Sequence, residues 1–466
     1  MKHHLRQEHR EAPAHAKACH STALLFMLPV LCFAGLASHI TEYDLDNGLH
    51  VIIYVDSSAP VVSTHVWYRV GAYDEPLGKT GLSHMLEHMT FKHTDRYEPG
   101  QFDNIIQEVG GRKNGFTSTY YTGYFEDLAS DRWELSLELE AARMSSCRFD
   151  EDEFQREHQV VTEEWRLGKN RPASELWQEF RCTAYLAHPH RTPLIGWDDD
   201  VRGYTTDAVA EWYREHYNPA NAVLVIAGDV RVEEAKSLVA KHFGPLKGRR
   251  VKRIDCYNSE PVQNSERMIT LRREVYAPAM LIGYHVPGIR DEDYYAGELV
   301  GWILLHGRTS RLYQKLVTET GLATWVGGGN TVSRDPGLLR LHVTPRSEED
   351  IARIVELIDQ EIDRLAAEPV TDRELAKVQN QMMADQVFAQ DNVSGLARTL
   401  ARSVITTGSW RFLERFPDEI AKVTKEEIRD FSERYLDPEN RTVALLLASG
   451  NSGSASHTQF PGEELK

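Results

Sequence analysis

The spacing of apolar residues along this chain alternates between the period of two typical of strands and the longer period typical of helices. Two strand-like runs within 40–56 flank Asp46-Asn47-Gly48, a sequence that favours a tight hairpin turn. Gly244-Pro245 marks the end of a later helix. In the first half of the chain, this pattern predicts further strands at 61–71, 112–125 and 221–228, and helices at 101–109, 133–147, 150–167 and 232–243.

The second half of the chain repeats this order of elements. It predicts strands at 266–275, 279–287, around 338–345 and at 441–449, and helices at 293–305, 310–318, 347–367 and 371–390. A chain of 466 residues is also long for one hydrophobic core. We therefore predict an α+β fold of two domains, each a mainly antiparallel sheet backed by helices. The expected boundaries are 38–246 and 263–449, with a linker at 247–262 and a disordered tail at 450–466.

The N-terminal segment has the composition of an export signal. Residues 1–22 are polar and carry more basic than acidic residues, and an apolar run from Ala23 to Ala37 ends in Gly35-Leu36-Ala37, a small-x-small cleavage pattern. The run is short for a membrane-spanning helix, so we expect no stable membrane insertion. We predict a signal peptide at 1–37 and a secreted, periplasmic protein.

Charge and cysteine content exclude several classes of protein. The formal net charge is −17, and it becomes −19 without residues 1–37, which carry four basic and two acidic residues. An acidic chain is poorly suited to nucleic acid or to an anionic membrane surface. Two of the five cysteines lie in the signal segment; the others are Cys147, Cys182 and Cys256. They allow at most one disulfide, and the sequence leaves its pairing open.

The segment His84-Met85-Leu86-Glu87-His88 carries the most specific chemistry. On a helix, positions i, i+3 and i+4 lie on one face, so His84, Glu87 and His88 can converge on one point. Two neutral imidazoles suit Zn²⁺, and a neighbouring carboxylate that is not a ligand can take a proton from a polarised water. This His-x-x-Glu-His order is the reverse of the commoner metallopeptidase motif. Such a zinc site needs a third protein ligand.

Four separated segments of the chain resemble the pitrilysin, insulin-degrading enzyme and mitochondrial processing peptidase family of inverted zinc peptidases. They are VGAYDEPLGKTGLSHMLEHMTFKHT, GGRKNGFTSTYYTGYFEDL, NPANAVLVIAGDV and HGRTSRLYQKL. The resemblance implies that the two domains are a duplicated α/β roll forming half of a clamshell. It also implies that Glu164 is the third zinc ligand and that Glu157, seven residues earlier, orients a ligating histidine. The adjacent Glu163 points about 100° away on a helix, which disfavours it as the ligand.

The run Arg112–Phe125 is rich in Thr, Tyr and Phe and is predicted to be a strand. In the family that it resembles, the corresponding strand lies at the sheet edge beside the metal and pairs with the substrate peptide through main-chain hydrogen bonds. The resemblance thus implies that Asn114, Gly115 and Phe116 bind substrate. Gly115 stands where the family usually has Ala.

One feature of the resembling family is missing from the second domain. Active members carry an Arg and a Tyr seven residues apart, which hold the substrate and stabilise the oxyanion. Here Val317 and Thr324 stand at those places. The resemblance therefore implies a heterodimer in which a second family subunit supplies the Arg/Tyr pair.

Together these observations predict a zinc-dependent endopeptidase that hydrolyses peptides or small unstructured proteins, with one Zn²⁺ per chain and Glu87 as the catalytic base. The alternative is a non-catalytic structural or interaction subunit of a peptidase-like complex. The complete set of His84, His88 and Glu164 favours the enzyme, because drift has no reason to preserve all the ligands of an unused site.

Overall fold

A computed structural model describes residues 35–251, 259–388 and 392–449. The first half of the chain builds a six-stranded sheet in the order β1-β2-β8-β3-β6-β5. Neighbouring strands are antiparallel except β2 and β8, which are parallel. The strands are β1 (Ile40–Asp44), β2 (His50–Val55), β3 (Val61–Tyr68), β5 (Arg112–Thr117), β6 (Thr122–Ala129) and β8 (Ala222–Gly228).

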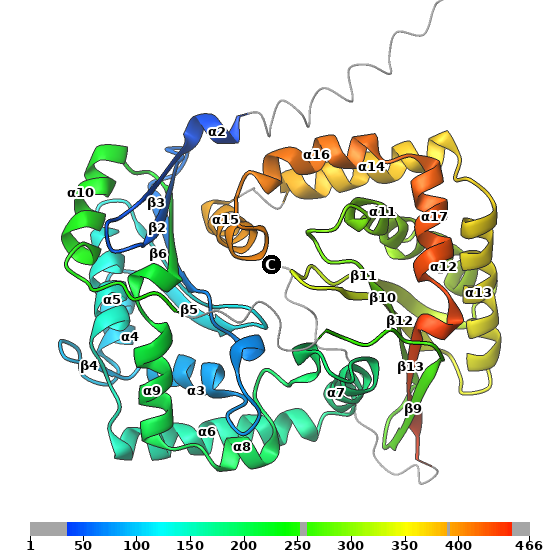
Figure 1. Cartoon of the computed structure of the whole chain (residues 1–466), viewed down its shortest axis with the longest axis horizontal. Coiled ribbons are helices and arrows are strands. Elements are labelled where there is room, and N and C mark those ends of the chain that lie inside the picture. Colours follow the sequence, from blue (N-terminus) through cyan, green and yellow to red (C-terminus); the bar gives the residue numbers. More distant parts are fainter. Residues whose placement is uncertain (1–34, 252–258, 389–391, 450–466) are drawn as a thin grey trace, which may run out of the picture.

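Helices cover the outer face of this sheet, and their apolar sides form one core with it (Figure 1). The helices of this half are α2 (Leu36–His39), α3 (Leu82–Met89), α4 (Gln101–Glu108), α5 (Glu134–Ser145), α6 (Glu151–Lys169), α7 (Pro172–Ala184), α8 (Asp198–Arg202), α9 (Thr206–His216) and α10 (Val232–Phe243). A short pair of strands, β4 (His93–Thr94) and β7 (Cys147–Arg148), joins the segments after α3 and α5.

The second half builds a five-stranded sheet in the order β11-β12-β10-β13-β9, in which only β13 and β9 are parallel. Its strands are β9 (Arg267–Arg273), β10 (Ala279–Val286), β11 (Ala323–Asn330), β12 (Gly337–Pro345) and β13 (Arg441–Ala448). Its helices are α11 (Tyr294–Leu305), α12 (Arg311–Tyr313), α13 (Ile351–Ala367), α14 (Asp372–Phe388), α15 (Val393–Thr407), α16 (Phe412–Lys422) and α17 (Lys425–Tyr435). The predicted α+β class, two mostly antiparallel sheets backed by helices, is confirmed.

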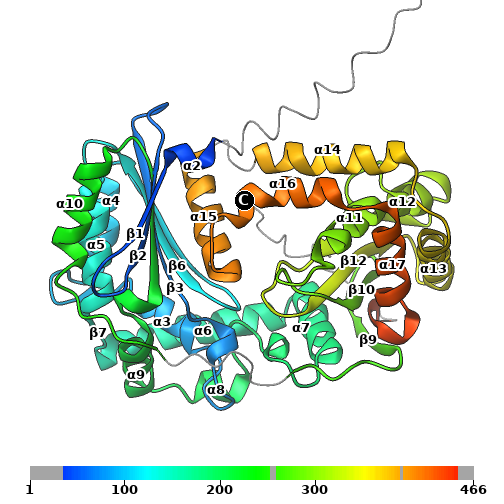
Figure 2. The same ribbon diagram turned by 45° about the horizontal axis from the view of Figure 1, so that its top comes forward.

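Two helices cross between the halves. Helix α15, from the second half, packs Leu396 and Leu400 against the inner face of the first sheet, beside Trp67 and Val225. Helix α7, from the first half, packs Phe180 and its neighbours against the inner face of the second sheet. Figures 1 and 2 show both helices between the two sheets. Each inner face is thus covered by a helix from the other half of the chain.

The prediction of one strand over Arg112–Phe125 is wrong. The run folds into the hairpin of β5 and β6, with a reverse turn between them in which the amide of Ser118 donates to the carbonyl of Tyr121 at 2.8 Å. The backbone amides of Ala72 and Tyr73 hold this turn through the carbonyls of Ser118 and Thr119. The turn has no Gly, Pro, Asn or Asp, and Ser118 alone is only a weak turn signal.

Several other predicted elements agree with the structure only in part. The helix expected at 310–318 begins as α12 and continues as a π-helical turn over Gln314–Glu319. The apolar pattern does not predict helices α7, α8, α9, α15, α16 and α17. Residues 1–34 of the expected signal peptide, the expected tail from 450 and Cys256 lie outside the described residues, whereas Cys147 and Cys182 are free thiols. None of the helices in the described part of the chain is long and apolar enough to cross a membrane.

Candidate metal centre

Helix α3, which carries the His-x-x-Glu-His motif, starts at a tightly packed turn. Gly81 precedes the helix with φ of +86°, and a Cβ there would lie 2.3 Å from the carbonyl oxygen of Ile195, so only glycine fits. The buried carboxyl group of Glu75 accepts hydrogen bonds from the amides of Gly81 and Ser83, at 2.5 and 2.7 Å. Burial raises the pKa of Glu75 to about 8, although these two amides oppose the shift. The start of α3 is therefore fixed by backbone contacts.

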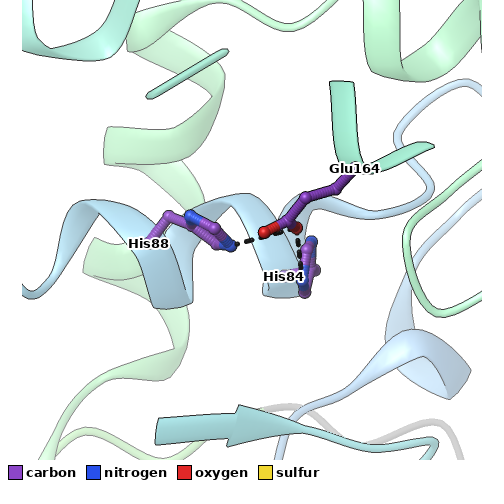
Figure 3. Close-up of side chains that lie close together, drawn as sticks. All are labelled: His84, His88 and Glu164. Carbon is purple, nitrogen blue, oxygen red and sulfur yellow. Dashed lines mark ion pairs between the residues drawn. The ribbon is translucent and has the colours of Figure 1, made fainter. Parts of the chain in front are cut away.

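Three of the sequence-predicted residues converge at the crossing of α3 and α6 (Figure 3). His84 and His88 lie one turn apart on α3, with ring centroids 4.9 Å apart. Glu164 reaches them from α6, and its Oε2 lies 3.8 Å from His84 Nε2 and 3.5 Å from His88 Nε2. All three ligand atoms lie within 4.8 Å of one another.

This spacing fits a zinc ion. Ligand atoms about 2.1 Å from a tetrahedral Zn²⁺ are about 3.4 Å from each other, close to the two distances measured from Glu164 Oε2. The same distances are at or beyond the limit of a useful hydrogen bond, so the three groups do not satisfy one another. His84 Nδ1 is buried with no hydrogen-bond partner among the described residues, and burial lowers the pKa of His84 to about 3. A neutral imidazole is the form that binds a metal.

The other ring nitrogen of His88 has its own partner. Its Nδ1 lies 3.2 Å from Oε2 of the buried Glu157, whose other oxygen pairs with Lys92 Nζ at 2.7 Å. Burial alone would lower the pKa of His88, but Glu157, Glu164 and Glu87 together raise it. A proton on Nδ1, donated to Glu157, leaves the Nε2 lone pair directed at Glu164 and the proposed metal position. Glu163, by contrast, is exposed and pairs with Arg166 on the same helix.

Glu87 lies on the same helix but is not part of the three-residue cluster. Thr117, on strand β5, donates its hydroxyl to Glu87 Oε2 at 2.6 Å. Burial raises the pKa of Glu87, and this hydrogen bond opposes the rise. A carboxylate with a raised pKa next to a metal position can both accept and return a proton near neutral pH.

Strand β5 forms one edge of the first sheet, because within the described residues it pairs only with β6. Asn114 is exposed on this strand, and Phe116 packs edge-on against Trp67 on the inner face, with ring centroids 5.0 Å apart. Gly115 lies on the opposite face, where a Cβ would approach the Phe91 ring to 2.8 Å. The replacement of Ala by Gly at this position therefore matches the bulk of Phe91.

Sequence reasoning missed the groups that support this cluster. Thr117 and Glu75 come from other parts of the chain, and no spacing indicates them. Lys92 is four residues after His88, a helical spacing that could have indicated it. The fully buried Arg143 donates to the carbonyl of Thr90 at the end of α3, at 3.2 Å, and to Glu140 at 2.8 Å. Together these contacts fix both ends of the helix.

Two family models match the chain. The first, described as insulinase (peptidase family M16), matches residues 50–196, which include the whole three-residue cluster. The second, described as the peptidase M16 inactive domain, matches residues 203–382.

Individual proteins agree with these models. The zinc protease PqqE of Helicobacter pylori is 30% identical over 86% of this chain and 94% of its own length. A crystal structure of a protease from Helicobacter pylori superposes with a TM-score of 0.82 at 28% identity, over 87% of this chain and 99% of that one. The periplasmic protease PqqL of Escherichia coli shares the fold, with a TM-score of 0.74 at 19% identity over 88% of this chain and 47% of its own.

Proposed function

Because this chain belongs to peptidase family M16, the insulinase family, we propose that it is the catalytic subunit of a zinc-dependent endopeptidase that hydrolyses peptides or small unstructured proteins. Relatives that match 86–88% of the chain are named zinc proteases. The observation that carries the proposal is the convergence of His84, His88 and Glu164, at separations that suit one zinc ion.

His84 and His88 would hold the ion through Nε2, and Glu164 would hold it through a carboxylate oxygen. Zinc supplies Lewis acidity at such a site, polarising a water molecule and the scissile carbonyl group. Glu157 fixes the ring of His88 through Nδ1, and Lys92 keeps Glu157 ionised by pairing with it.

Glu87 is proposed to move the proton. Thr117 occupies its Oε2, which leaves Oε1 to accept a proton from the attacking water and to return it to the leaving amine. The hydrogen bond from Thr117 also restricts the rotation of the carboxylate, so that the base keeps one orientation.

The free edge of β5 is proposed as the place where the substrate binds. Alternate residues of the segment Asn114, Gly115 and Phe116 present their backbone groups to that edge, and an extended peptide can add to it as a further strand. The same strand carries Thr117, so a peptide paired with β5 would pass beside Glu87. Main-chain pairing accepts many sequences but requires an extended chain, which is why we propose unstructured substrates.

A second family subunit is proposed to complete the site. Val317 packs against the core of the second half, and the Thr324 hydroxyl donates to the carbonyl of Thr344 at 3.2 Å. Neither side chain offers a cationic or phenolic donor to an oxyanion. We therefore propose a heterodimer in which the partner supplies an Arg and a Tyr.

A periplasmic location is also proposed. It is supported by the signal-like composition of residues 1–37 and by the location named for the structural neighbour PqqL. The acidic net charge disfavours nucleic acid as the bound molecule, and the free edge of β5 suits a peptide.

The test is zinc analysis and peptide cleavage with the purified chain, alone and with a family subunit encoded beside it. We expect about one zinc per chain, and cleavage that is lost on chelation and restored by Zn²⁺. The competing proposal is a non-catalytic subunit, and its one support is that the model matching 203–382 is described as an inactive domain. Absence of bound zinc and of cleavage in every combination would establish that alternative.

A further inference from the structure

An arginine from the second half of the chain lies on the inner face of the first sheet, beside the proposed substrate strand. Arg398 belongs to α15, the helix that covers this face (Figure 2). Its guanidinium lies over the rings of Phe116 on β5 and Phe125 on β6, at 5.3 and 5.5 Å from the two centroids. The side chain is half-buried. A cationic group is thus placed within one side-chain length of the free edge of β5.

Among the described residues, Arg398 has no hydrogen bond and no ion pair. Its neighbour Arg112 does: it pairs with Asp127 at 2.6 Å, and Asp127 also accepts the hydroxyl of Ser63. The neighbouring carboxylate, that of Asp127, therefore already has other partners. Burial is the largest effect and lowers the pKa of Arg398, although Tyr121 opposes it. The positive charges of Arg112 and Arg402 lower this pKa further, and Asp127 raises it by the smallest effect.

Stacking alone does not account for this arrangement. The fully buried Arg143 also stacks on aromatic rings, those of Phe91 and Tyr124, but it has Glu140 as a carboxylate partner at 2.8 Å. A guanidinium that lies flat on a ring keeps its N–H groups free at the edge, directed for two parallel hydrogen bonds to a carboxylate. The guanidinium of Arg398 likewise lies over two rings, but no carboxylate of the described residues pairs with it.

The alternation of β5 determines which substrate side chains can reach this group. Lys113, Gly115 and Thr117 face α3 and Phe91, whereas Asn114 and Phe116 share the inner face with Arg398. A peptide paired with β5 places every second side chain on that inner face, about 5 Å from its neighbours on β5.

We propose that Arg398 is a specificity residue that binds an acidic side chain of the peptide paired with β5. The inference rests on the proposed function and names its substrate class. These substrates are peptides with Asp or Glu close to the scissile bond, at a position whose side chain faces the inner surface of the sheet. Arg402, one turn further along α15, also lacks an ion pair within the described part of the chain and can add to the positive field. The site is positive within a chain of net charge −17, so it attracts acidic residues that the rest of the surface repels.

A peptide-binding measurement tests the role of Arg398 without depending on turnover. The zinc-loaded Glu87→Gln chain is titrated, by fluorescence anisotropy, with labelled unstructured peptides that carry one Glu moved along the sequence, each matched by a peptide with Gln at that place. At one or two alternate positions, we expect the Glu peptide to bind about 10- to 100-fold more tightly than its Gln partner. The difference should disappear below about pH 4, where the substrate carboxyl group is protonated.

Matched variants test whether the preference for the Glu peptide comes from Arg398. Arg398→Gln in the same background should bind both peptides equally, and Arg398→Glu should prefer a peptide with Lys at that position. The control is Arg411→Gln, since Arg411 also stacks on an aromatic ring, that of Trp410, but is exposed and pairs with Glu414. The control should keep the preference, and circular dichroism melting should show that all variants are folded.

Two outcomes would overturn the inference while leaving the proposed peptidase in place: equal affinity for Glu and Gln peptides in the chain that has Arg398, or an unchanged preference in a folded Arg398→Gln variant. A chain that neither holds zinc nor binds or cleaves any peptide would overturn the proposed function, and the inference with it.

Discussion

The hydroxyl of Thr117 donates to the carboxylate of Glu87 at 2.6 Å, and this hydrogen bond joins the edge strand β5 to the helix that carries the proposed zinc ligands. The backbone of β5 is where a substrate strand would pair, and Glu87 is the proposed base. One contact therefore sets the position of the base relative to the bound peptide, and a small change in β5 is transmitted directly to the carboxylate.

Thr117→Val should lower kcat for an unstructured peptide by about 3- to 10-fold, the value of one ordinary hydrogen bond, because the base loses its orientation. Zinc content should stay unchanged, since Thr117 does not contact the three-residue cluster. Thr117→Ser keeps the hydroxyl and is the matched control. A loss of activity as large in Ser as in Val would mean that the methyl group, and not the hydrogen bond, is what matters.

Glu87→Gln should abolish cleavage while leaving about one zinc per chain. Loss of a general base typically lowers the rate by about 10²- to 10⁴-fold, and an amide cannot accept the proton. The measurement is zinc by atomic emission beside turnover of a fluorogenic peptide. Loss of the metal in this variant would show that Glu87 is a ligand and has been misassigned.

Three of the glutamates of α6 should differ in their effect on zinc retention. Glu164→Gln should weaken binding strongly, and Glu157→Gln should weaken it by the 10- to 100-fold typical of groups that orient a ligand, about 1.4–2.7 kcal/mol. Glu163→Gln should have no effect, because its carboxylate pairs with Arg166 at the surface. The check is metal remaining after dialysis against a graded series of chelator concentrations; equal loss from positions 163 and 164 would refute the ligand assignment.

The isolated chain should hold zinc yet cleave peptides feebly, because Val317 and Thr324 cannot stabilise an oxyanion. Each missing donor typically costs about 10²- to 10³-fold in rate. A family subunit with the Arg/Tyr pair should restore turnover, and its own Arg→Ala variant should not. Full activity of the zinc-loaded chain without any partner would exclude the heterodimer.

Stability should depend on pH through Glu298, far from the proposed zinc site. Its Oε1 is enclosed without a partner among the described residues, and burial raises the pKa of Glu298 to about 7 against opposing hydrogen bonds with Asn330 and Tyr294. Between about pH 4.5 and 7 the folded state keeps a proton that the unfolded state has lost. This group's contribution to stability therefore falls as pH rises through that window, by about 3 kcal/mol in total, and is constant above it.

Glu298→Gln mimics the protonated form and should remove this dependence. Compared with the parent, the variant should gain in melting temperature from pH 5 to pH 8, whereas exposed Glu292→Gln should follow the parent at every pH. If the melting temperatures of the parent and of Glu298→Gln change with pH in the same way across this range, Glu298 is ionised in the folded state even at pH 5.

The residues of the candidate site were predictable from sequence because helical geometry is local. His84, Glu87 and His88 share a face because they lie on one helix. Glu164 shares a face with Glu157 for the same reason, since both lie on one helix. The crossing of α3 and α6 that joins these faces came from resemblance to a family, since no local pattern fixes how two helices separated by more than 60 residues meet.

Contacts set by tertiary packing were beyond the sequence. The turn at 118–121 is held by backbone groups of Ala72 and Tyr73, and its own residues carry only the weak turn signal of Ser118. Arg398 is 282 residues from Phe116, and only the path of α15 across the first sheet brings them together. Apolar periodicity predicts that a helix is buried, but not which sheet it covers.

The exchange of α7 and α15 also limits how the molecule can move. Separating the two sheets would expose two apolar faces at once, those under Phe180 and under Leu400, so a hinge inside the chain is strongly opposed by the hydrophobic effect. Each subunit should behave as a single stiff shell. In a chamber built from two such subunits, a peptide would enter through the interface between them. The stability of that interface, and not flexibility within either chain, would then set how often the chamber opens.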